Sequence, residues 1–314
     1  MKSQDPYAET ITFGVELETT LPDNSGVEVG LYHNGSVVRC GRDATTGAMV
    51  PAPQFHGTHW RAERDSSIRP RPGRTACEFV SPILHGSHGV EHLVAFMEWA
   101  RGIGANVNAS CGCHITIGVA SVIGTNDPQA MSEFARKLAH IARWHAMSLY
   151  GQTGTGRHLN SYCHTLDDQV GQLVRRMQRT SNPQRKVNAA NRCGRGMVNF
   201  KKLFSHGVIE FRVFAGTLNS RKLMHHLATV LGICRRAAEV RCLGRFAKNA
   251  RQAKRTTTAV EALQFLWDYL GWTGSKRPMA LGLVGPLHAE FTRYRQAALR
   301  MCQRFDARFP NAAL

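Results

Sequence analysis

The chain has 314 residues, of which 43% are hydrophobic, and this length and composition support an extensive core and exclude a disordered protein. Its 40 Lys and Arg residues outnumber its 22 Asp and Glu residues, so the formal net charge is +18. No acidic residue lies between Asp168 and Glu210, a stretch that contains nine basic residues. This imbalance predicts a partner that carries phosphates, such as a nucleotide, a nucleic acid or another polyanion. Outside that stretch, a basic and well-solvated surface is an equal alternative.

The nine cysteines are scattered without paired spacing, which favours a reducing compartment and predicts a cytoplasmic protein. The first ten residues contain no apolar signal-peptide core. No segment approaches the roughly 18 uninterrupted apolar residues of a membrane-spanning helix. We therefore expect neither secretion nor a membrane span.

The first half of the chain alternates strand-like and helix-like segments. Residues 10–18 alternate apolar and polar side chains as a strand does, and the Asn34-Gly35 pair predicts a hairpin within residues 29–40. A Gly-, Pro- and Thr-rich loop is expected at residues 41–54, followed by a strand at 75–81, a helix at 88–102 and a strand at 111–119. Asp127 and Pro128 supply an N-cap and a first-turn proline, which open one long helix that ends at Gly151.

The second half becomes increasingly helical. A short basic helix is expected at residues 166–178, whereas residues 180–196 show no clear period and are expected to be ordered by a ligand. Two strands at 197–204 and 208–214 precede helices at 221–243, 258–270 and 286–309. A capping box at Thr258 and Glu261 opens the second of these helices. Strands with intervening helices and a helical tail predict an α+β fold.

Polar residues recur on one face of several predicted strands. Glu16 and Glu18 lie opposite the apolar face of the first strand, and residues two apart on a strand are separated by about 6.5–7 Å. The same alternation places the polar residues of residues 76–80, 113–119 and 208–214 away from their apolar neighbours. If these strands belong to one sheet, a single surface carries Glu16, Glu18, Glu78, His114, Glu210 and Arg212.

Such a surface predicts a metal site. Carboxylates on neighbouring strands, about 4.8 Å apart, would repel one another unless cations lay between them. Four carboxylates and one imidazole suit Mg²⁺ or Mn²⁺ better than Zn²⁺, and Arg212 would neutralise phosphate oxygens during phosphoryl transfer.

Structural alternatives exist for each of these residues. The acidic strand would be a solvated edge strand, His114 a core histidine, and Glu210 with Arg212 a simple ion pair. Cys111-Gly-Cys113-His114 would be half of a zinc site, which is disfavoured because the sequence offers no second half.

The ordered motifs resemble the amidoligases related to glutamine synthetase and glutamate-cysteine ligase, which use ATP to join a carboxylate to an amine. The resemblance covers about residues 10–235, and each matching segment is short, but their order and spacing are specific. The segments are residues 13–18 (FGVELE), 60–67, 78–82 (EFVSP), 111–114 (CGCH), 157–162 (RHLNSY), 195–199, and 209–212 (IEFR) with Gly216-Thr217.

The resemblance implies a largely antiparallel sheet whose polar face holds divalent ions and the ATP phosphates. This glutamine synthetase-like catalytic domain would span residues 1–243, with a helical extension at 244–314 packed on it. Glu16, His114 and Glu210 would hold one ion, and Glu18 with Glu78 another. Arg212 would stabilise the transferred phosphoryl group, and Asp65 would orient the amine. The residues expected to contact the nucleotide or the substrate carboxylate are Arg157, Arg195, Asn199 and Thr116.

One position departs from the family. Relatives often carry a second histidine two residues after the first, and here Thr116 stands in its place. Threonine can donate a hydrogen bond to a phosphate but carries no charge, whereas all the expected carboxylates and Arg212 are present. We therefore expect an active ligase.

The expected reaction uses ATP and Mg²⁺ or Mn²⁺ and passes through an acyl phosphate, with an amino acid, a peptide or a nucleic-acid-linked molecule as substrate. Two other classes remain open. A metal-dependent nuclease or phosphoesterase would use the same carboxylates, and a non-catalytic nucleic-acid-binding protein would use only the basic residues.

Overall fold

A computed structural model describes residues 10–166, 168–240, 258–272, 285–312 and 314. Its centre is a sheet in which every pairing between the named strands is antiparallel. In sheet order the strands are β2 (Ser36–Val37), β5 (Arg61–Glu63), β6 (Arg74–Val80), β1 (Thr12–Pro22), β8 (Gly112–Gly118), β10 (Val208–Ala215) and β9 (Val198–Asn199). A short strand, β7 (Leu84–His85), pairs with β1, and β3 (Cys40–Arg42) and β4 (Met49–Pro51) form a separate hairpin.

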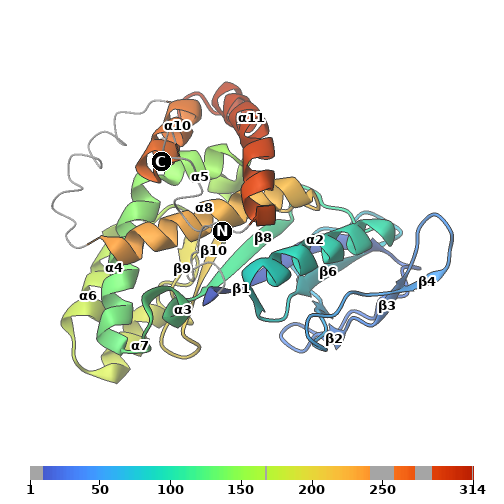
Figure 1. The fold of residues 1–314 in the computed structure, drawn as a ribbon, viewed down its shortest axis with the longest axis horizontal. Helices are drawn as coiled ribbons and strands as arrows, with labels where there is room; N and C mark the ends of the chain where they lie inside the picture. The colour runs from blue at the N-terminus through green and yellow to red at the C-terminus, as the bar shows by residue number, and fades with distance from the viewer. Residues whose placement is uncertain (1–9, 167, 241–257, 273–284, 313) are drawn as a thin grey trace, which may run out of the picture.

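Helices lie against this sheet and beyond one end of it (Figure 1). They are α2 (Gly86–Gly102), α3 (Val119–Ile123), α4 (Pro128–Trp144), α5 (Ala146–Gly151), the 3-10 helix η1 (Arg157–Leu159), α6 (Asp168–Arg179), α7 (Pro183–Asn191), α8 (Ser220–Glu239), α10 (Ala259–Tyr269) and α11 (Gly285–Arg308). The combination of a mostly antiparallel sheet with helices confirms the mixed α and β architecture expected from the sequence.

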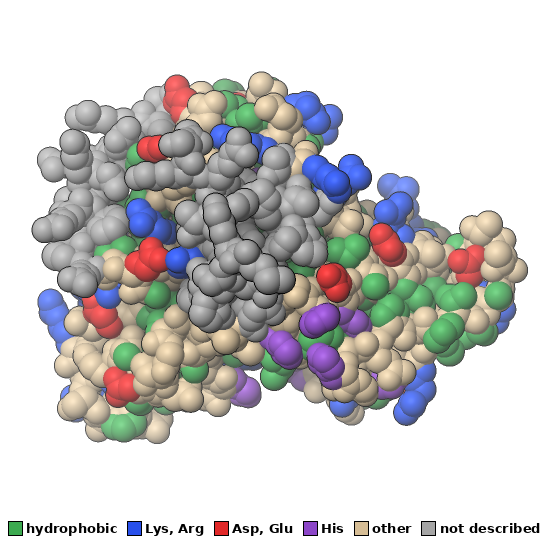
Figure 2. All heavy atoms as spheres, viewed as in Figure 1, with side chains coloured by type: hydrophobic (Ala, Val, Ile, Leu, Met, Phe, Trp, Pro, Cys, Tyr) green, Lys and Arg blue, Asp and Glu red, His purple; other side chains and the backbone are tan. Residues whose placement is uncertain are grey.

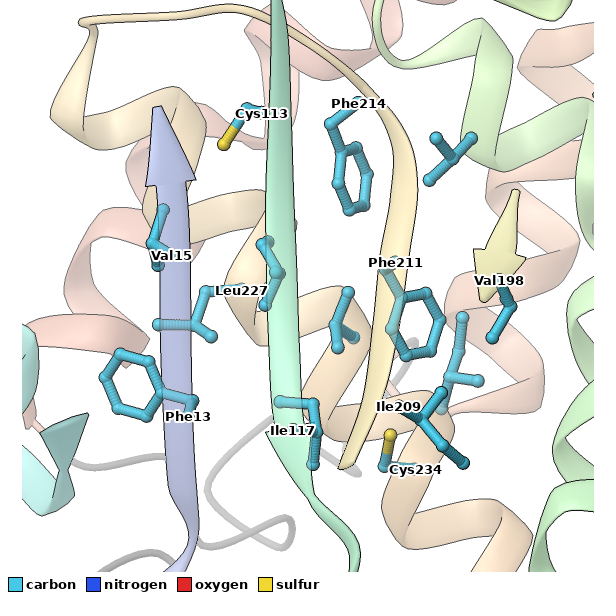
Figure 3. Close-up of a cluster of buried hydrophobic side chains, with 14 of the residues drawn as sticks. Phe13, Val15, Cys113, Ile117, Val198, Ile209, Phe211, Phe214, Leu227 and Cys234 are labelled. Atoms are coloured by element: carbon cyan, nitrogen blue, oxygen red, sulfur yellow. The ribbon is translucent and has the colours of Figure 1, made fainter. Parts of the chain in front are cut away.

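The apolar face of the sheet forms the core because alternate residues of each strand point to the same side. Phe13 and Val15 of β1, Ile117 of β8 and Phe211 of β10 are buried and lie side by side (Figure 3). Leu227 of α8 packs in the same cluster. With its apolar side covered, the sheet presents its polar residues on the other face.

A bulge in β10 adjusts this alternation. The register with β8 shifts between Phe211 and Phe214, so that Val213 and Phe214, although adjacent in sequence, are both fully buried. The backbone N–H of Arg212 donates instead to the carbonyl of Met197. The irregularity therefore begins beside the arginine singled out from the sequence.

Several predicted elements differ from the structure. The expected loop at residues 41–54 contains the β3–β4 hairpin, because the Asp43 carboxylate accepts hydrogen bonds from Thr45 and Thr46 and Gly47 adopts a positive φ of 73°. The hairpin expected around Asn34-Gly35 is reduced to a single bridge, and β2 pairs with β5.

The helix expected from residue 128 to residue 151 is broken at His145, whose ring packs against Phe265 and Tyr269. Residues 180–196, expected to lack regular structure, include α7, which begins with Asn182 as N-cap and Pro183 in the first turn. The strand expected at residues 197–204 is limited to β9.

The C-terminal helices α10 and α11 pack against α5 and α8. Thr258 caps α10 by accepting a hydrogen bond from the N–H of Glu261, as its sequence predicts. The expected domain boundary at residues 243 and 244 lies outside the described residues. None of the described helices is long and apolar enough to cross a membrane.

Candidate active site

The polar face of the sheet is built from three cross-strand rows. The first row pairs Glu63 of β5 with Glu78 of β6 and Glu78 with Glu18 of β1. The second row pairs Glu16 of β1 with His114 of β8. Directly paired residues point to the same face of a sheet.

The third row pairs Thr116 of β8 with Gly14 of β1 and with Glu210 of β10, and Glu210 with Asn199 of β9. We call the surface formed by these rows the acidic face, defined by Glu16, Glu18, Glu63, Glu78, His114 and Glu210.

His114 lies at the centre of the acidic face and is almost fully buried. Its Nδ1 lies 3.0 Å from Glu16 Oε2, 3.3 Å from Glu210 Oε1 and 3.9 Å from Glu78 Oε1. Its Nε2 lies 3.3 Å from Glu18 Oε1. Four of the five predicted metal-binding residues thus surround the fifth.

Two groups of three side chains have ligand atoms within 4.8 Å of one another. The first is Glu16, Glu78 and His114, and the second is Glu18, Asp65 and Glu78. Glu78 belongs to both groups, so it could bridge two ions. The groups keep Glu16 with His114 and Glu18 with Glu78, as the family resemblance implies. They differ from it because Glu78 takes the place of Glu210 in the first group and Asp65 joins the second.

Electrostatics at the acidic face reflect an excess of negative charge. Burial, followed by the charges of Glu16, Glu18 and Asp65, raises the pKa of Glu78 well above its usual value. Burial also acts to raise the pKa of Glu16, but the hydrogen bond and charge of His114 outweigh it and lower that pKa. A divalent cation would relieve the repulsion that Glu78 experiences.

Glu210 is held from both sides. Its Oε2 accepts a hydrogen bond of 2.7 Å from Asn199 Nδ2, and its Oε1 accepts one of 2.6 Å from Arg212 Nη1. Arg212 Nε donates to the carbonyl of Tyr162 at 3.1 Å. Burial acts to lower the pKa of Arg212, but Glu210 and Glu16 outweigh it and raise that pKa, so the guanidinium stays charged. These contacts fix the Arg212 guanidinium at the edge of the acidic face.

Arg157 reaches the other side of His114 from η1 and is buried. Its Nη2 lies 3.4 Å from His114 Nε2 and donates to the carbonyl of Arg212 at 3.3 Å, while its Nε finds no hydrogen-bond partner among the described residues. A Cβ atom on Gly112 would lie 2.2 Å from Arg157 Nη2. The same glycine donates its backbone N–H to Glu18 Oε2 at 2.5 Å. A side chain at position 112 would therefore displace the Arg157 guanidinium from its place beside His114.

Five of the six residues of the acidic face line a cleft of about 810 Å³, whereas Glu18 is buried and does not line it. Asp65, Arg195, Asn199 and Arg212 all line this cleft, whereas Thr116 lines an adjoining pocket of about 370 Å³. Asn199 also lines that pocket, together with the largely apolar group of Pro82, Ile83, Val208 and Ala120. Arg157, the remaining residue predicted to contact the nucleotide, lines neither the cleft nor the pocket. Its guanidinium lies next to the His114 ring.

Three further residues join the site although the sequence did not single them out. Glu63 is buried opposite Glu78, Tyr32 stands at the rim of the cleft, and Lys202 lines both the cleft and the pocket. Glu63 and Asp65 are two positions apart in the segment Arg61-Ala62-Glu63-Arg64-Asp65. This spacing is the sequence signal that could have placed Glu63 on the same face as Asp65. No local pattern reveals Tyr32, because its position depends on a loop closed by a bridge between residues 31 and 34.

A second set of histidines lies away from this site. Histidine side chains gather near the N-terminal end of α2 (Figure 2). The His56 and His85 rings stack with centroids 5.8 Å apart, and His92 Nε2 accepts a hydrogen bond from Trp60 Nε1 at 2.9 Å. Neither of the two groups with metal-ligand spacing in the described part of the chain includes these histidines.

A family model described as "Putative amidoligase enzyme" matches residues 9–234, well over half of the chain. The chain belongs to this amidoligase family. The match includes every residue of the acidic face, and it identifies the amidoligase as an enzyme of the ligase type. No curated protein and no solved structure matches the amidoligase.

Proposed function

We propose that this amidoligase is an ATP-dependent carboxylate-amine ligase that works through an acyl phosphate. The observation that carries the proposal is the convergence of Glu16, Glu18, Glu78, His114 and Glu210, with Arg212 beside them, on one open face of the sheet. An antiparallel sheet with this face exposed is also what a glutamine synthetase-like catalytic domain requires.

The side chains fit Mg²⁺ or Mn²⁺. Oxygen atoms dominate the donor set, and a single imidazole accompanies them, which suits these hard cations better than Zn²⁺. The raised pKa of Glu78 is a second argument, because a buried carboxylate surrounded by others gains most from added positive charge. Glu16, Glu78 and His114 would hold one ion, and Glu18, Asp65 and Glu78 another, with Glu210 in reach of the first. Bound cations would neutralise the phosphate oxygens of the nucleotide.

The pocket of about 370 Å³ is the best candidate for the nucleotide base and sugar. Pro82, Ile83 and Val208 provide apolar walls, and Gly14 lines the pocket without a side chain to fill it. Thr116 and Lys202 stand where this pocket meets the acidic face and would contact the phosphates. The γ-phosphate would then lie over the carboxylates, within reach of Arg212.

The two chemical steps use different residues of the cleft. An oxygen of the substrate carboxylate attacks the γ-phosphorus, and the bond to the leaving ADP breaks, which yields an acyl phosphate. Arg212 stabilises the charge of the transferred group, and Arg195 holds the carboxylate substrate. Glu63, together with the Asp65 oxygen that the second ion would leave free, attracts the incoming amine as an ammonium ion. Glu63 accepts a proton from the ammonium ion, and the neutral amine then attacks the acyl carbon. The C–N bond forms, inorganic phosphate leaves, and the second proton of the nitrogen passes to solvent in the cleft.

The test is release of ADP and phosphate from ATP and Mg²⁺ in the presence of arrayed carboxylates and amines. Release should require a matched pair, and the product should contain a new amide by mass spectrometry. Arg212→Ala and Glu16→Ala should each lower the rate by about 10²–10³-fold, the usual loss for a group that stabilises transition-state charge. The control is Glu133→Gln, which changes a half-buried carboxylate on α4 that pairs with Arg136 and lies in neither cavity of the site.

Two outcomes would contradict the proposal. Unchanged rates in both alanine variants would separate any ATP turnover from the acidic face. Cleavage of a nucleic acid with metal but without nucleotide would assign the same carboxylates to a nuclease or phosphoesterase.

A further inference from the structure

Helices α6 and α7 enclose a groove of about 520 Å³ that the proposed chemistry does not use. Arg176 and Arg179 line it from α6, and Arg185 and Arg192 line it from α7 and the residue that follows. Leu173 and Ala189 form part of its apolar floor. We call this surface the arginine groove, defined by these six residues.

A buried lysine fixes the two walls of the arginine groove. The Lys186 ammonium donates to Met177 O at 2.6 Å, to Gln129 Oε1 at 2.8 Å and to Ser132 Oγ at 2.9 Å. These bonds tie α7 to the last turns of α6 and to the start of α4. The groove is therefore formed before any ligand arrives, and binding would cost little reorganisation.

The charge of the arginine groove is not compensated within the described part of the chain. No carboxylate lines it, and no ion pair joins its four guanidinium groups to an acidic residue described by the structure. Guanidinium groups that are exposed and close together repel one another, and phosphate relieves this because it accepts their hydrogen bonds in pairs. Two facing rows of arginine suit a ligand with repeated charges better than a single phosphate.

The arginine groove runs into the cleft. Leu173 and Arg192 line both, and Arg195, Lys201 and Lys202 continue the basic surface to the acidic face. A ligand bound along the arginine groove would therefore extend to the proposed reaction centre.

Exposed tyrosines stand along the same cleft. Tyr32 is 61% exposed and Tyr162 is 45% exposed, and the Arg195 guanidinium lies 5.3 Å from the centre of the Tyr162 ring. Aromatic rings beside a basic groove are the combination by which proteins bind single-stranded nucleic acid, with bases stacked on rings and phosphates on basic side chains.

We propose that the arginine groove binds the phosphate backbone of a single-stranded nucleic acid, and that this strand carries into the cleft the carboxylate or amine that is ligated. The second clause rests on the proposed function, whereas strand binding does not. Bases from the same strand stack on Tyr32 and Tyr162. The substrate is thus a modified nucleotide within or at the end of a strand.

The experiment measures binding of a labelled single strand of about 12 nucleotides by fluorescence anisotropy, from about 0.05 to 0.3 M salt, with EDTA and without ATP. The double variant Arg176→Gln/Arg185→Gln removes one guanidinium from each wall. Arg39→Gln/Arg71→Gln is the matched control, because it removes the same charge from two exposed arginines that line neither the groove nor the cleft.

Each lost phosphate contact lowers the slope of log K against log salt by about 0.7 for a single strand. The groove variant should therefore lower the slope by about 1.4 and weaken binding about 25-fold near 0.1 M salt, whereas the control changes neither. Tyr32→Ala/Tyr162→Ala should weaken binding of the strand at least about tenfold but leave binding of inorganic polyphosphate unchanged.

Equal losses in the groove variant and in the control would overturn the groove assignment, since net charge alone would then explain binding. Equal competition by polyphosphate, with no effect of the tyrosines, would overturn the assignment to nucleic acid. Tighter binding of a duplex than of the single strand would do the same for the single-stranded form.

The two proposals fail separately. Strand binding does not require the acidic face, so Glu18→Gln should keep full strand binding. Strand binding by the unaltered protein without ligation of any substrate contradicts the ligase and leaves the groove assignment intact. Ligation of free small molecules by a protein that binds no strand contradicts only the groove assignment.

Discussion

Replacing Glu78 with glutamine should change the stability of the amidoligase in opposite directions with and without metal. The ligand atoms of Glu78 and Glu16 lie within 4.8 Å, and two unit charges at that distance repel by about 3.5 kcal/mol in an effective dielectric constant of about 20. The folded protein can avoid this repulsion by protonating Glu78. At pH 7.5, protonating a carboxyl group whose usual pKa is 4.5 costs about 4 kcal/mol, which is therefore the upper limit of the destabilisation.

Glu78→Gln should therefore raise the free energy of unfolding by about 1–3 kcal/mol in EDTA at pH 7.5. For 314 residues the unfolding entropy is about 0.66 kcal/mol/K, so the midpoint should rise by about 2–5 °C. The pKa of Glu78 is raised in the folded protein, so protonated Glu78 contributes its full stability below pH 4.5. This contribution is lost as the pH rises through the pKa of the folded state. The advantage of the variant should thus disappear as the pH approaches 4.5.

Added Mg²⁺ should reverse the order. At a concentration 100 times its dissociation constant, a ligand stabilises the folded protein by about 2.7 kcal/mol, and the variant should lose most of this gain. The assay is thermal unfolding followed by circular dichroism, with Glu133→Gln as the control that responds to neither EDTA nor Mg²⁺. Equal destabilisation of Glu78→Gln in both conditions would refute the reasoning, because it would make Glu78 a structural hydrogen-bonding group.

Three further predictions concern residues around the site and in the core. Gly112→Ala should lower the ligation rate about 100-fold, because its Cβ would meet Arg157 Nη2 at 2.2 Å, whereas Gly171→Ala, with no atom within 4 Å, should leave the rate unchanged. Burial lowers the pKa of His145 to about 3, so the stability that neutral His145 contributes is lost as the pH falls below 6.5. The free energy of unfolding should fall by about 2 kcal/mol between pH 7.5 and pH 5 for this reason. His145→Phe should abolish that loss in urea titrations at the two pH values. Lys186→Met should cost about 3 kcal/mol in the same urea assay, because the buried acceptors Ser132 Oγ and Met177 O lose a charged donor. A cost below about 1 kcal/mol would show that the ammonium does not tie the helices together.

Much of the fold was predictable because its signals are local. The alternation in residues 10–18 predicts β1 correctly, and the Asp127-Pro128 and Thr258 caps correctly mark the starts of α4 and α10. The sequence also contains the cap of α7 in Asn182-Pro183. The helix was not predicted, because the residues that follow show no hydrophobic period. Here the buried Lys186 replaces the apolar side chain that such a pattern requires.

The candidate site divides in the same way. Which residues point away from the core follows from the two-residue period of a strand, so Glu16, Glu18 and His114 could be assigned to one kind of face in advance. Their grouping could not, because it depends on which strands are neighbours. Asp65 lies outside any strand, and its approach to Glu18 and Glu78 depends on the loop after β5.

The sequence by itself determined the amidoligase family, the set of outward-facing carboxylates and the excess of positive charge. The tertiary structure decided that Glu78 lies opposite Glu18 and that His114 lies opposite Glu16. It also decided that the arginines of α6 and α7 form one groove that opens into the cleft. The physical reason is that alternation and capping act between residues a few positions apart, whereas strand order, register and helix packing join residues that are distant in the chain.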